Sequence, residues 1–416
     1  MQAFGKSKRM AVTVAHTRSI DYNKYINYMI MFYALILPLS RAGIVLMSTL
    51  LLLMWILEGN FKEKFRLLSR SKVIVALALF IGYNLISILW SDDAYMAFEY
   101  VKKYWYFIPM LIIYTSIKKE NINKTLSLFI LGMLISEVIA YGVFFGLWEF
   151  KNVSAQNPTP FMHHIEYSVF LAFTALIMLS RIFNSHQLKT KLLYIPFFIT
   201  ITGNLFLTAG RTGQLAFIIG LLVLALMSFK NKLKAVMVFT VLVVTFFSLA
   251  FTFSQTFHDR MSMAKNSLLH LEAQNGYCSS WGSRIGAWVV SRHMIEAHPV
   301  LGIGIDDNMQ NFYHLIRTQY PEMICGGHTL VHMHNQYLQI LTQTGIVGLI
   351  LFLAIFYYIA RIRIRDREYR HIKYLYVVIT LFAFVSEVLL HRQFNMALFA
   401  LIVGLLLAKE RAEHAV

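Results

Sequence analysis

Two histidines and an asparagine stand just before a long apolar stretch near the C-terminal end of the chain, in the motif His332-Met333-His334-Asn335. An imidazole titrates near neutral pH, so it can accept or donate a proton during a reaction. Asn335 can cap the helix that follows or orient a neighbouring imidazole. The motif therefore predicts a general base at a membrane boundary. A metal site and chemically silent interface histidines stay open as alternatives.

Four arginines lie in turns or loops that the topology described below puts on the same side of a membrane as this motif: Arg211, Arg260, Arg284 and Arg392. Arg211 stands in a tight turn between two apolar stretches, where a partly desolvated cation needs a polar cavity or an anion. A guanidinium group binds phosphate oxygens in pairs and keeps its charge. A single such arginine is typical of an interface anchor, but four arginines together with the histidines favour an anion site.

The sequence favours chemistry without a metal ion or another cofactor. A metal site would need further ligands at suitable spacing, and the chain has no HExxH motif near the histidines and no Asp-x-Asp pair in the outer loops. The pairs Asp92-Asp93 and Asp306-Asp307 are typical of solvated turns. Helix packing or interface placement explains the remaining ionisable residues equally well, and we do not include them in the site: Glu137, Glu387, His163, His164 and Glu166.

The elements that must position these residues are long apolar helices. Of the 416 residues, 57% are apolar and 14% are charged, whereas soluble domains carry about 45–50% apolar and about 25% charged residues. A spanning helix needs about 17–25 residues. The sequence lacks the alternation of apolar and polar residues that would indicate a membrane β-barrel. We expect an all-α polytopic membrane protein with about twelve transmembrane helices: 26–40, 42–57, 73–90, 104–117, 125–148, 165–183, 191–209, 212–229, 233–254, 336–360, 372–390 and 393–408.

The basic residues indicate the orientation of these helices. With a cytoplasmic N-terminus and alternating sides, 27 of the 38 Lys and Arg fall on the cytoplasmic side, as the positive-inside rule expects. This bias accounts for the net charge of +17 without a nucleic-acid partner. The basic runs Lys62–Lys72 and Arg361–Arg370 are most simply topology anchors, and a lipid-headgroup site is the alternative. The basic N-terminal segment lacks the apolar core of a removable signal peptide.

The chain divides into five predicted regions around one long polar loop. A structureless loop of that length would be unusual, so we expect it to fold and to carry function. Helical spacing indicates a helix over Arg284–Ala297 and a second over 308–319. The regions are a cytoplasmic segment (1–25), transmembrane helices one to nine (26–254), a periplasmic loop domain (255–335), transmembrane helices ten to twelve (336–408) and a cytoplasmic tail (409–416).

Both cysteines of the chain, Cys278 and Cys325, lie in this loop. A periplasmic location permits a disulfide bond, which would stabilise the loop by about 3–4 kcal/mol on the chain-entropy model. We therefore expect a Cys278–Cys325 disulfide, with two unpaired cysteines as the alternative.

The motifs together resemble those of bacterial O-antigen ligases, in the superfamily of O-antigen ligases and polymerases. The resemblance rests on Thr-Ala-Gly-Arg211-Thr-Gly, Asp259-Arg260, Gly-Ser-Arg284-Ile-Gly, Pro299-x-x-Gly302-x-Gly304 and His332-x-His334-Asn335, in this order and on one predicted side. It implies a GT-C-type glycosyltransferase of the bacterial inner membrane with its active site facing the periplasm. The donor would be a glycan on undecaprenyl diphosphate, and the acceptor would be the lipid A core oligosaccharide.

The resemblance also implies roles for individual residues. Arg211, Arg260 and Arg284 match the diphosphate-binding arginines of the family. His334 matches its catalytic histidine, and His332 matches a supporting histidine. We expect a metal-independent single displacement with inversion at the anomeric carbon. A polysaccharide polymerase of the same superfamily and, less favoured, a transporter or flippase stay open as alternative functions.

Overall fold

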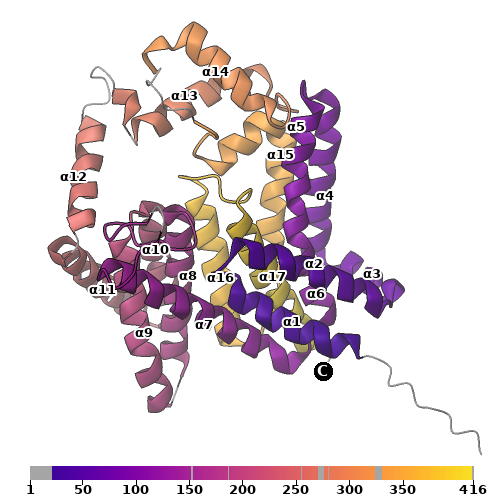
Figure 1. The fold of residues 1–416 in the computed structure, drawn as a ribbon, viewed down its shortest axis with the longest axis vertical. Coiled ribbons are helices and arrows are strands. Elements are labelled where there is room, and N and C mark those ends of the chain that lie inside the picture. The colour runs from indigo at the N-terminus through magenta and orange to yellow at the C-terminus, as the bar shows by residue number, and fades with distance from the viewer. Residues whose placement is uncertain are drawn as a thin grey trace, which may run out of the picture.

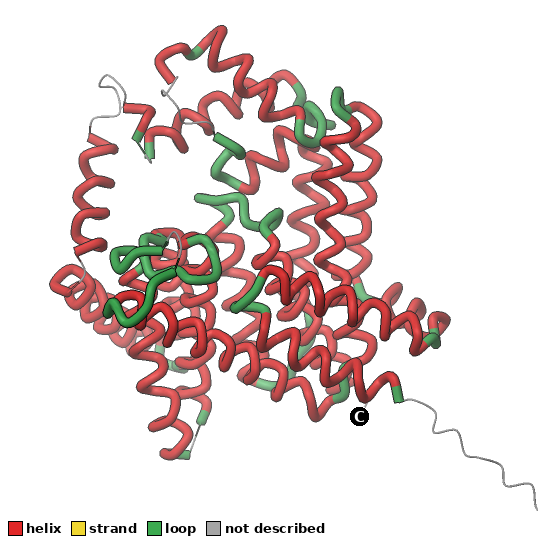
Figure 2. Tube along the Cα trace, viewed as in Figure 1, coloured by secondary structure: helices red, strands yellow, loops and turns green. Residues whose placement is uncertain are grey.

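The computed structural model describes residues 21–150, 153–185, 187–253, 255–269, 276–279, 281–323 and 330–414. This part of the chain is all-helical, as expected, apart from one isolated bridge between Ser154 and Asn157 (Figures 1 and 2). The α-helices are α1 (Tyr22–Ile36), α2 (Arg41–Glu58), α3 (Phe61–Arg70), α4 (Lys72–Ser87), α5 (Ala94–Lys102), α6 (Ile108–Ser116), α7 (Lys119–Phe144), α8 (His164–Asn184), α9 (Leu188–Leu207), α10 (Arg211–Ser228), α11 (Lys232–Phe253), α12 (Gln255–Leu269), α13 (Gly282–Ala297), α14 (Asp307–Gln319), α15 (Gln336–Arg361), α16 (Arg367–Ala383) and α17 (Gln393–His414). Four short 3-10 helices join them: η1 (Ile88–Trp90), η2 (Lys103–Phe107), η3 (Gly276–Cys278) and η4 (Pro321–Met323).

Within the described residues, nine helices are long and apolar enough to cross a membrane. They are α2, α4 extended by η1, α7, α8, α9, α10, α11, α15 and α17. The three other predicted spans overlap only in part with α1, α6 and α16, which are shorter than 18 residues. The chain is therefore a multi-pass membrane protein, and the number of twelve spans stays a prediction.

Two helices form the centre of the bundle. Nearly every residue of α8 is buried from Ile165 to Ser180, and α17 is buried from Met396 to Ala408. A helix that is apolar on all sides is either buried or faces lipid. The apolar helix α11 is of the lipid-facing kind, because only Ala235 and Ala250 are buried among its residues. The side chains of the site described below lie on elements other than α11.

The long loop folds into helices at one end of the bundle. Helices α13 and α14 lie together above the transmembrane helices, and α12 runs along one side (Figure 1). The predicted helices over Arg284–Ala297 and 308–319 correspond to α13 and α14. The loop therefore contains helices that can position side chains, although its location in the periplasm stays a prediction.

A backbone break in α15 anchors this loop to the bundle. Gly345 has φ 61° and ψ −163° inside the helix, a conformation open essentially to glycine alone. The turn after α13 packs against the break. There the N–H of Ile303 donates to the carbonyl of Thr342 (2.9 Å), and the N–H of Ile346 donates to the carbonyl of Pro299 (3.0 Å). These bonds satisfy backbone groups that the kink would otherwise leave unpaired.

Candidate active site

The histidine motif lies where the loop enters α15, and its backbone is unusual. Asn335 caps the helix, because its side-chain oxygen accepts from the N–H of Tyr337 (2.9 Å) and of Leu338 (3.1 Å). His334 directly before it has φ 49°, a left-handed conformation that is uncommon for a residue with a side chain. Such strain persists only where surrounding contacts hold it, and it is frequent at functional sites.

A carboxylate that sequence reasoning left out of the site ties the motif together. Glu387 lies in the loop between α16 and α17, and its side chain is fully buried (0% exposed). One of its oxygens lies 3.0 Å from His332 Nε2, and the other lies 3.4 Å from His334 Nδ1. The predicted span 372–390 put Glu387 inside a helix, but α16 ends at Ala383. The sequence feature that could have identified Glu387 as a site residue is its acidic side chain within an apolar segment.

The hydrogen bonds of His332 indicate its tautomer. Its Nδ1 accepts from the backbone N–H of His334 (3.2 Å), so the proton of the neutral ring is assigned to Nε2, which donates to Glu387. Burial lowers the pKa of His332 to about 4, against the opposing attraction of Glu387. His332 is therefore neutral near pH 7 and orients the carboxylate.

The carboxylate itself stays ionised. Burial alone would raise the pKa of Glu387, but the hydrogen bond from His334 and the neighbouring positive charges outweigh it and lower the pKa to about 2. Arg392 and Arg284 contribute guanidinium groups at 3.5 Å and 3.8 Å from the Glu387 oxygens. The negative charge of Glu387 is thus balanced by these cations rather than by a proton.

This arrangement leaves His334 suited to accept a proton. If its Nδ1 carries the proton that points to Glu387, its Nε2 presents a lone pair. A buried carboxylate that holds an imidazole in this tautomer also stabilises the imidazolium that forms on proton uptake. The His334 side chain is 21% exposed, whereas that of Glu387 has no exposure. A substrate can therefore reach the imidazole but not the carboxylate.

Two of the three predicted diphosphate-binding arginines border one cavity. Arg211, the first residue of α10, and Arg284, in the first turn of α13, line it together with His164, Thr212, Trp281 and Ser386. The Arg284 Nε donates to the backbone carbonyl of Ser386 (3.4 Å), next to Glu387 in the chain. The structure therefore brings Arg284 close both to Arg211 and to the carboxylate that contacts the histidines.

Other predicted residues lie at the edge of the site or outside the described part. Arg260 belongs to α12, but its side chain is not among the described atoms. Arg392 lies between Glu387 and Glu166, with 3.9 Å between its Nη1 and a Glu166 oxygen. Cys278 ends η3, whereas Cys325 lies outside the described residues. The Cys278–Cys325 disulfide therefore stays a prediction.

The two histidines of the motif and Glu387 form the one group in the described part of the chain that offers three ligand atoms for a metal ion. Atoms of His332, His334 and Glu387 lie within 4.8 Å of one another. This cluster was not expected from the sequence, because Glu387 is far from the histidines along the chain. Two guanidinium groups already lie within 4 Å of its carboxylate, and their positive charge opposes the binding of a further cation.

Residues 196–353 match the family model described as O-antigen ligase. The match shows that this segment is similar to the O-antigen ligase family. The family resemblance drawn from the motifs is thereby confirmed, and the superfamily implies a membrane enzyme of glycosyltransferase type. The matched segment contains the predicted arginines Arg211, Arg260 and Arg284 and both histidines, while Glu387 lies beyond its end.

A relative in Haemophilus influenzae, described as an uncharacterized protein, supports a shared architecture beyond that segment. It is 23% identical over 342 residues, which cover 78% of this chain and 83% of the relative. The similarity therefore extends over most of both chains.

Proposed function

We propose that the protein transfers an O-antigen glycan from undecaprenyl diphosphate to the lipid A core oligosaccharide at the periplasmic face of the bacterial inner membrane. The observation that carries this proposal is the contact of His334 with the ionised Glu387, beside a cavity bordered by Arg211 and Arg284. The first pair can accept a proton, and the second can hold a diphosphate. A GT-C-type reaction of this kind needs both.

The acceptor hydroxyl is activated by His334. As the hydroxyl oxygen attacks the anomeric carbon of the donor sugar, its proton passes to Nε2 of the imidazole, and Glu387 stabilises the resulting positive charge. General-base catalysis of this type contributes about 10²–10⁴-fold in rate. Attack from the face opposite the leaving group inverts the anomeric configuration.

The leaving group is stabilised by the arginines. The bond between the anomeric carbon and the phosphate oxygen breaks, and the electron pair stays on the lipid diphosphate. Arg211 and Arg284, joined by Arg260 on the strength of the family motif, offset the charge that develops there. Guanidinium groups fulfil the role that a divalent metal has in other phosphate chemistry, so we expect the reaction to proceed without a metal ion.

The reaction can be tested with purified protein in detergent, a lipid-linked glycan donor and lipid A core acceptor. Glycan attached to the core supports a ligase, whereas an elongated lipid-linked glycan would identify a polymerase of the same superfamily. Any turnover in detergent, where no gradient exists, contradicts a pure transporter. Activity in EDTA supports the arginine mechanism, and a strict requirement for Mg²⁺ or Mn²⁺ would replace it with a metal ion at His332, His334 and Glu387.

The arginines can be tested separately. Arg211→Ala, Arg260→Ala and Arg284→Ala should each weaken donor binding or turnover, and lysine should restore activity only in part, since an ammonium is a point charge without a planar fork. Arg317→Ala is the matched control, because Arg317 is exposed on α14. Full activity in all three alanine variants would contradict the anion site.

A further inference from the structure

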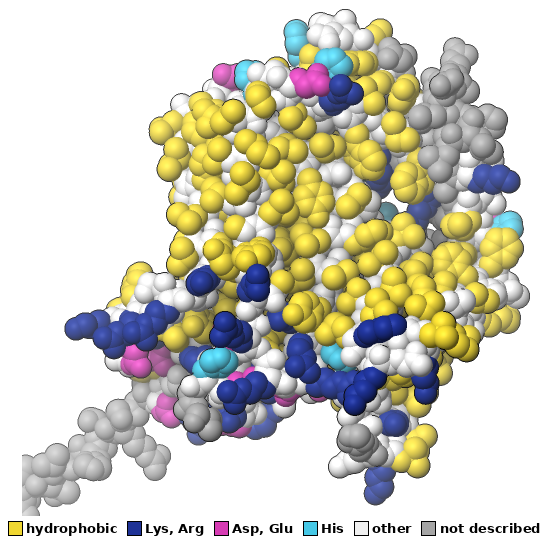
Figure 3. Space-filling model, turned by 180° about the vertical axis from the view of Figure 1, so that it is seen from behind, with side chains coloured by type: hydrophobic (Ala, Val, Ile, Leu, Met, Phe, Trp, Pro, Cys, Tyr) yellow, Lys and Arg dark blue, Asp and Glu magenta, His cyan; other side chains and the backbone are white. Residues whose placement is uncertain are grey.

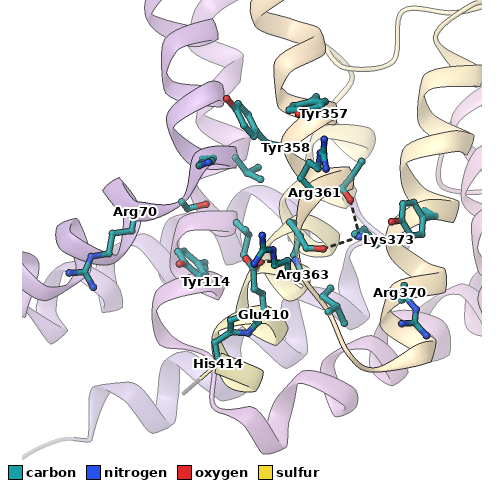
Figure 4. A pocket seen from close by; sticks show the side chains of 18 of the residues that line it. Arg70, Tyr114, Tyr357, Tyr358, Arg361, Arg363, Arg370, Lys373, Glu410 and His414 are labelled. Carbon is teal, nitrogen blue, oxygen red and sulfur yellow. Dashed lines mark hydrogen bonds between the residues drawn. The ribbon is translucent and has the colours of Figure 1, made fainter. Parts of the chain in front are cut away.

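A second, basic pocket lies at the other end of α15 from the histidine motif. The C-terminal end of α15, the α15–α16 connection and parts of α3, α4, α6, α16 and α17 line it (Figure 4). Helix α15 has 26 residues, which correspond to roughly 40 Å at 1.5 Å per residue. The pocket is therefore distinct from the candidate active site.

The pocket has a large excess of positive charge. Only one carboxylate, Glu410, lines it, and this carboxylate accepts from the backbone N–H of Arg363 (2.7 Å). Among the described residues, the guanidinium groups of Arg70, Arg363 and Arg370 have no ion-pair partner. The cations that line the pocket are Arg70, Lys72, Arg361, Arg363, Arg365, Arg370 and Lys373.

One of these cations is buried. Lys373 is 4% exposed, and its Nζ donates to the carbonyls of Ala360 and Ile362, at 2.9 Å each. Within the described part of the chain it forms no ion pair, although buried ammonium groups are normally paired. Lys373 thus fixes the end of α15 and contributes an uncompensated positive charge to the pocket wall. An anion in the pocket would supply the missing counter-charge.

Exposed apolar residues also lie on the helices that line the pocket. Val75 and Leu79 on α4 and Leu353 and Tyr357 on α15 are exposed apolar residues on the helices that lead away from it. Seen from behind, the Lys and Arg side chains gather along the lower edge of the molecule, beneath a broad hydrophobic band (Figure 3). A lipid bound here could keep its acyl chains against this band and its headgroup among the arginines.

We propose that this pocket binds the phosphate groups of an anionic phospholipid of the cytoplasmic leaflet, with a two-phosphate headgroup as the best match. Basic pockets between transmembrane helices on the cytoplasmic side bind such headgroups. The cavity measures about 1010 Å³, at the upper end of ligand sites, which are about 300–1,000 Å³. It therefore has room for more than one phosphate.

The test is native mass spectrometry of the purified full chain in detergent, titrated with cardiolipin or with zwitterionic phosphatidylcholine. The wild type should retain cardiolipin in preference to phosphatidylcholine. Each arginine contributes about fivefold to binding, so the triple variant Arg361→Gln, Arg363→Gln, Arg370→Gln should bind cardiolipin about a hundredfold more weakly. The single variant Arg363→Gln should lose about fivefold and guards against misfolding of the triple variant.

The matched control removes the same charge from another basic region. Lys189, Lys191 and Lys230 do not line the pocket, so their triple glutamine variant should keep cardiolipin binding within about twofold. Equal loss in both triple variants would show unspecific attraction and overturn the proposal. Equal retention of phosphatidylcholine, or displacement of cardiolipin by an equal concentration of inorganic phosphate, would overturn it as well. None of these outcomes depends on glycosyl transfer.

Discussion

At the scale of single residues, Glu387 gives each histidine of the motif a defined orientation. Its two oxygens contact one imidazole each, and two arginines balance its charge. The ring of His332 is neutral, so its contribution is to hold the carboxylate in position. The carboxylate in turn orients the His334 ring. The two histidines of the motif therefore have different roles, although they stand only two residues apart.

The first prediction concerns this carboxylate. Glu387→Gln keeps the shape of the side chain but removes the charge that would stabilise an imidazolium at His334. Turnover should fall by about 10²- to 10⁴-fold, while KM for the lipid-linked donor changes only severalfold. Steady-state kinetics with a thermal melt as folding control measure both quantities. Glu296→Gln on the exposed face of α13 is the matched control, and unchanged turnover in Glu387→Gln would remove the carboxylate from the mechanism.

A second prediction separates the two histidines. His334→Ala should abolish transfer and leave donor binding near normal, because a base acts in the transition state. His332→Ala should be milder and should mainly weaken donor binding or the positioning of Glu387. Single-turnover assays and donor-binding measurements on the same preparations distinguish these effects. An active and well-folded His334→Ala protein is incompatible with the general-base assignment.

The buried imidazole of His332 should also make stability depend on pH. Its pKa is about 4 in the folded protein against a reference value of 6.5, so the unfolded chain binds the proton more readily. The stability is fully present above about pH 6.5 and is lost as the pH falls towards 4. His332→Gln should lose roughly 1–3 kcal/mol less over this window. Thermal melts at pH 7.5, 5.5 and 4.5 test this, with exposed His314→Gln as control, which should follow the wild-type curve.

At the scale of elements, the sequence predicts the helices well and their long-range contacts poorly. Long apolar stretches bounded by charges define spans with little ambiguity, and α10, α11 and α15 begin within a residue of the expected positions. The side chain of Glu387 could not be placed in this way, because its partner His334 lies 53 residues away. Pairing over such a distance depends on how helices pack, and periodicity carries no information about that.

The kink in α15 leads to a prediction about the loop. A Cβ on Gly345 would lie 2.1 Å from the carbonyl oxygen of Val300, and the backbone there is strained for any other residue, at about 1–3 kcal/mol. Gly345→Ala should therefore lower the melting temperature and the transfer activity together, because the α13–α14 turn would lose its hydrogen bonds to α15 at the kink. Gly82→Ala is the control, since a Cβ there meets no atom within 4 Å. A Gly345→Ala protein as stable as the control would contradict this account of the kink.

At the scale of the whole molecule, the charge distribution makes the orientation testable. The positive-inside rule puts the α15–α16 connection and the C-terminus in the cytoplasm and the long loop on the other side. A tag after residue 416 and one in the segment 361–373 should be cleaved only from the cytoplasmic side. A tag near residue 270 should be cleaved only from the periplasmic side. Protease access to any of them from the wrong side would refute the topology and, with it, the periplasmic reaction.

The hydrogen bonds between the α13–α14 turn and α15 join two segments that are synthesised at different times. The turn at residues 299–304 leaves the ribosome before the helix that contains Thr342 and Ile346. At about 5–20 residues per second, the delay between the two is several seconds. The turn is therefore synthesised before α15 is available to pair with it, whereas α15 is synthesised when the turn already exists. We therefore expect synthesis in this order to pair the carbonyls at the kink as the helix forms, and we expect a circular permutant that placed α15 ahead of the loop to leave them unpaired for longer.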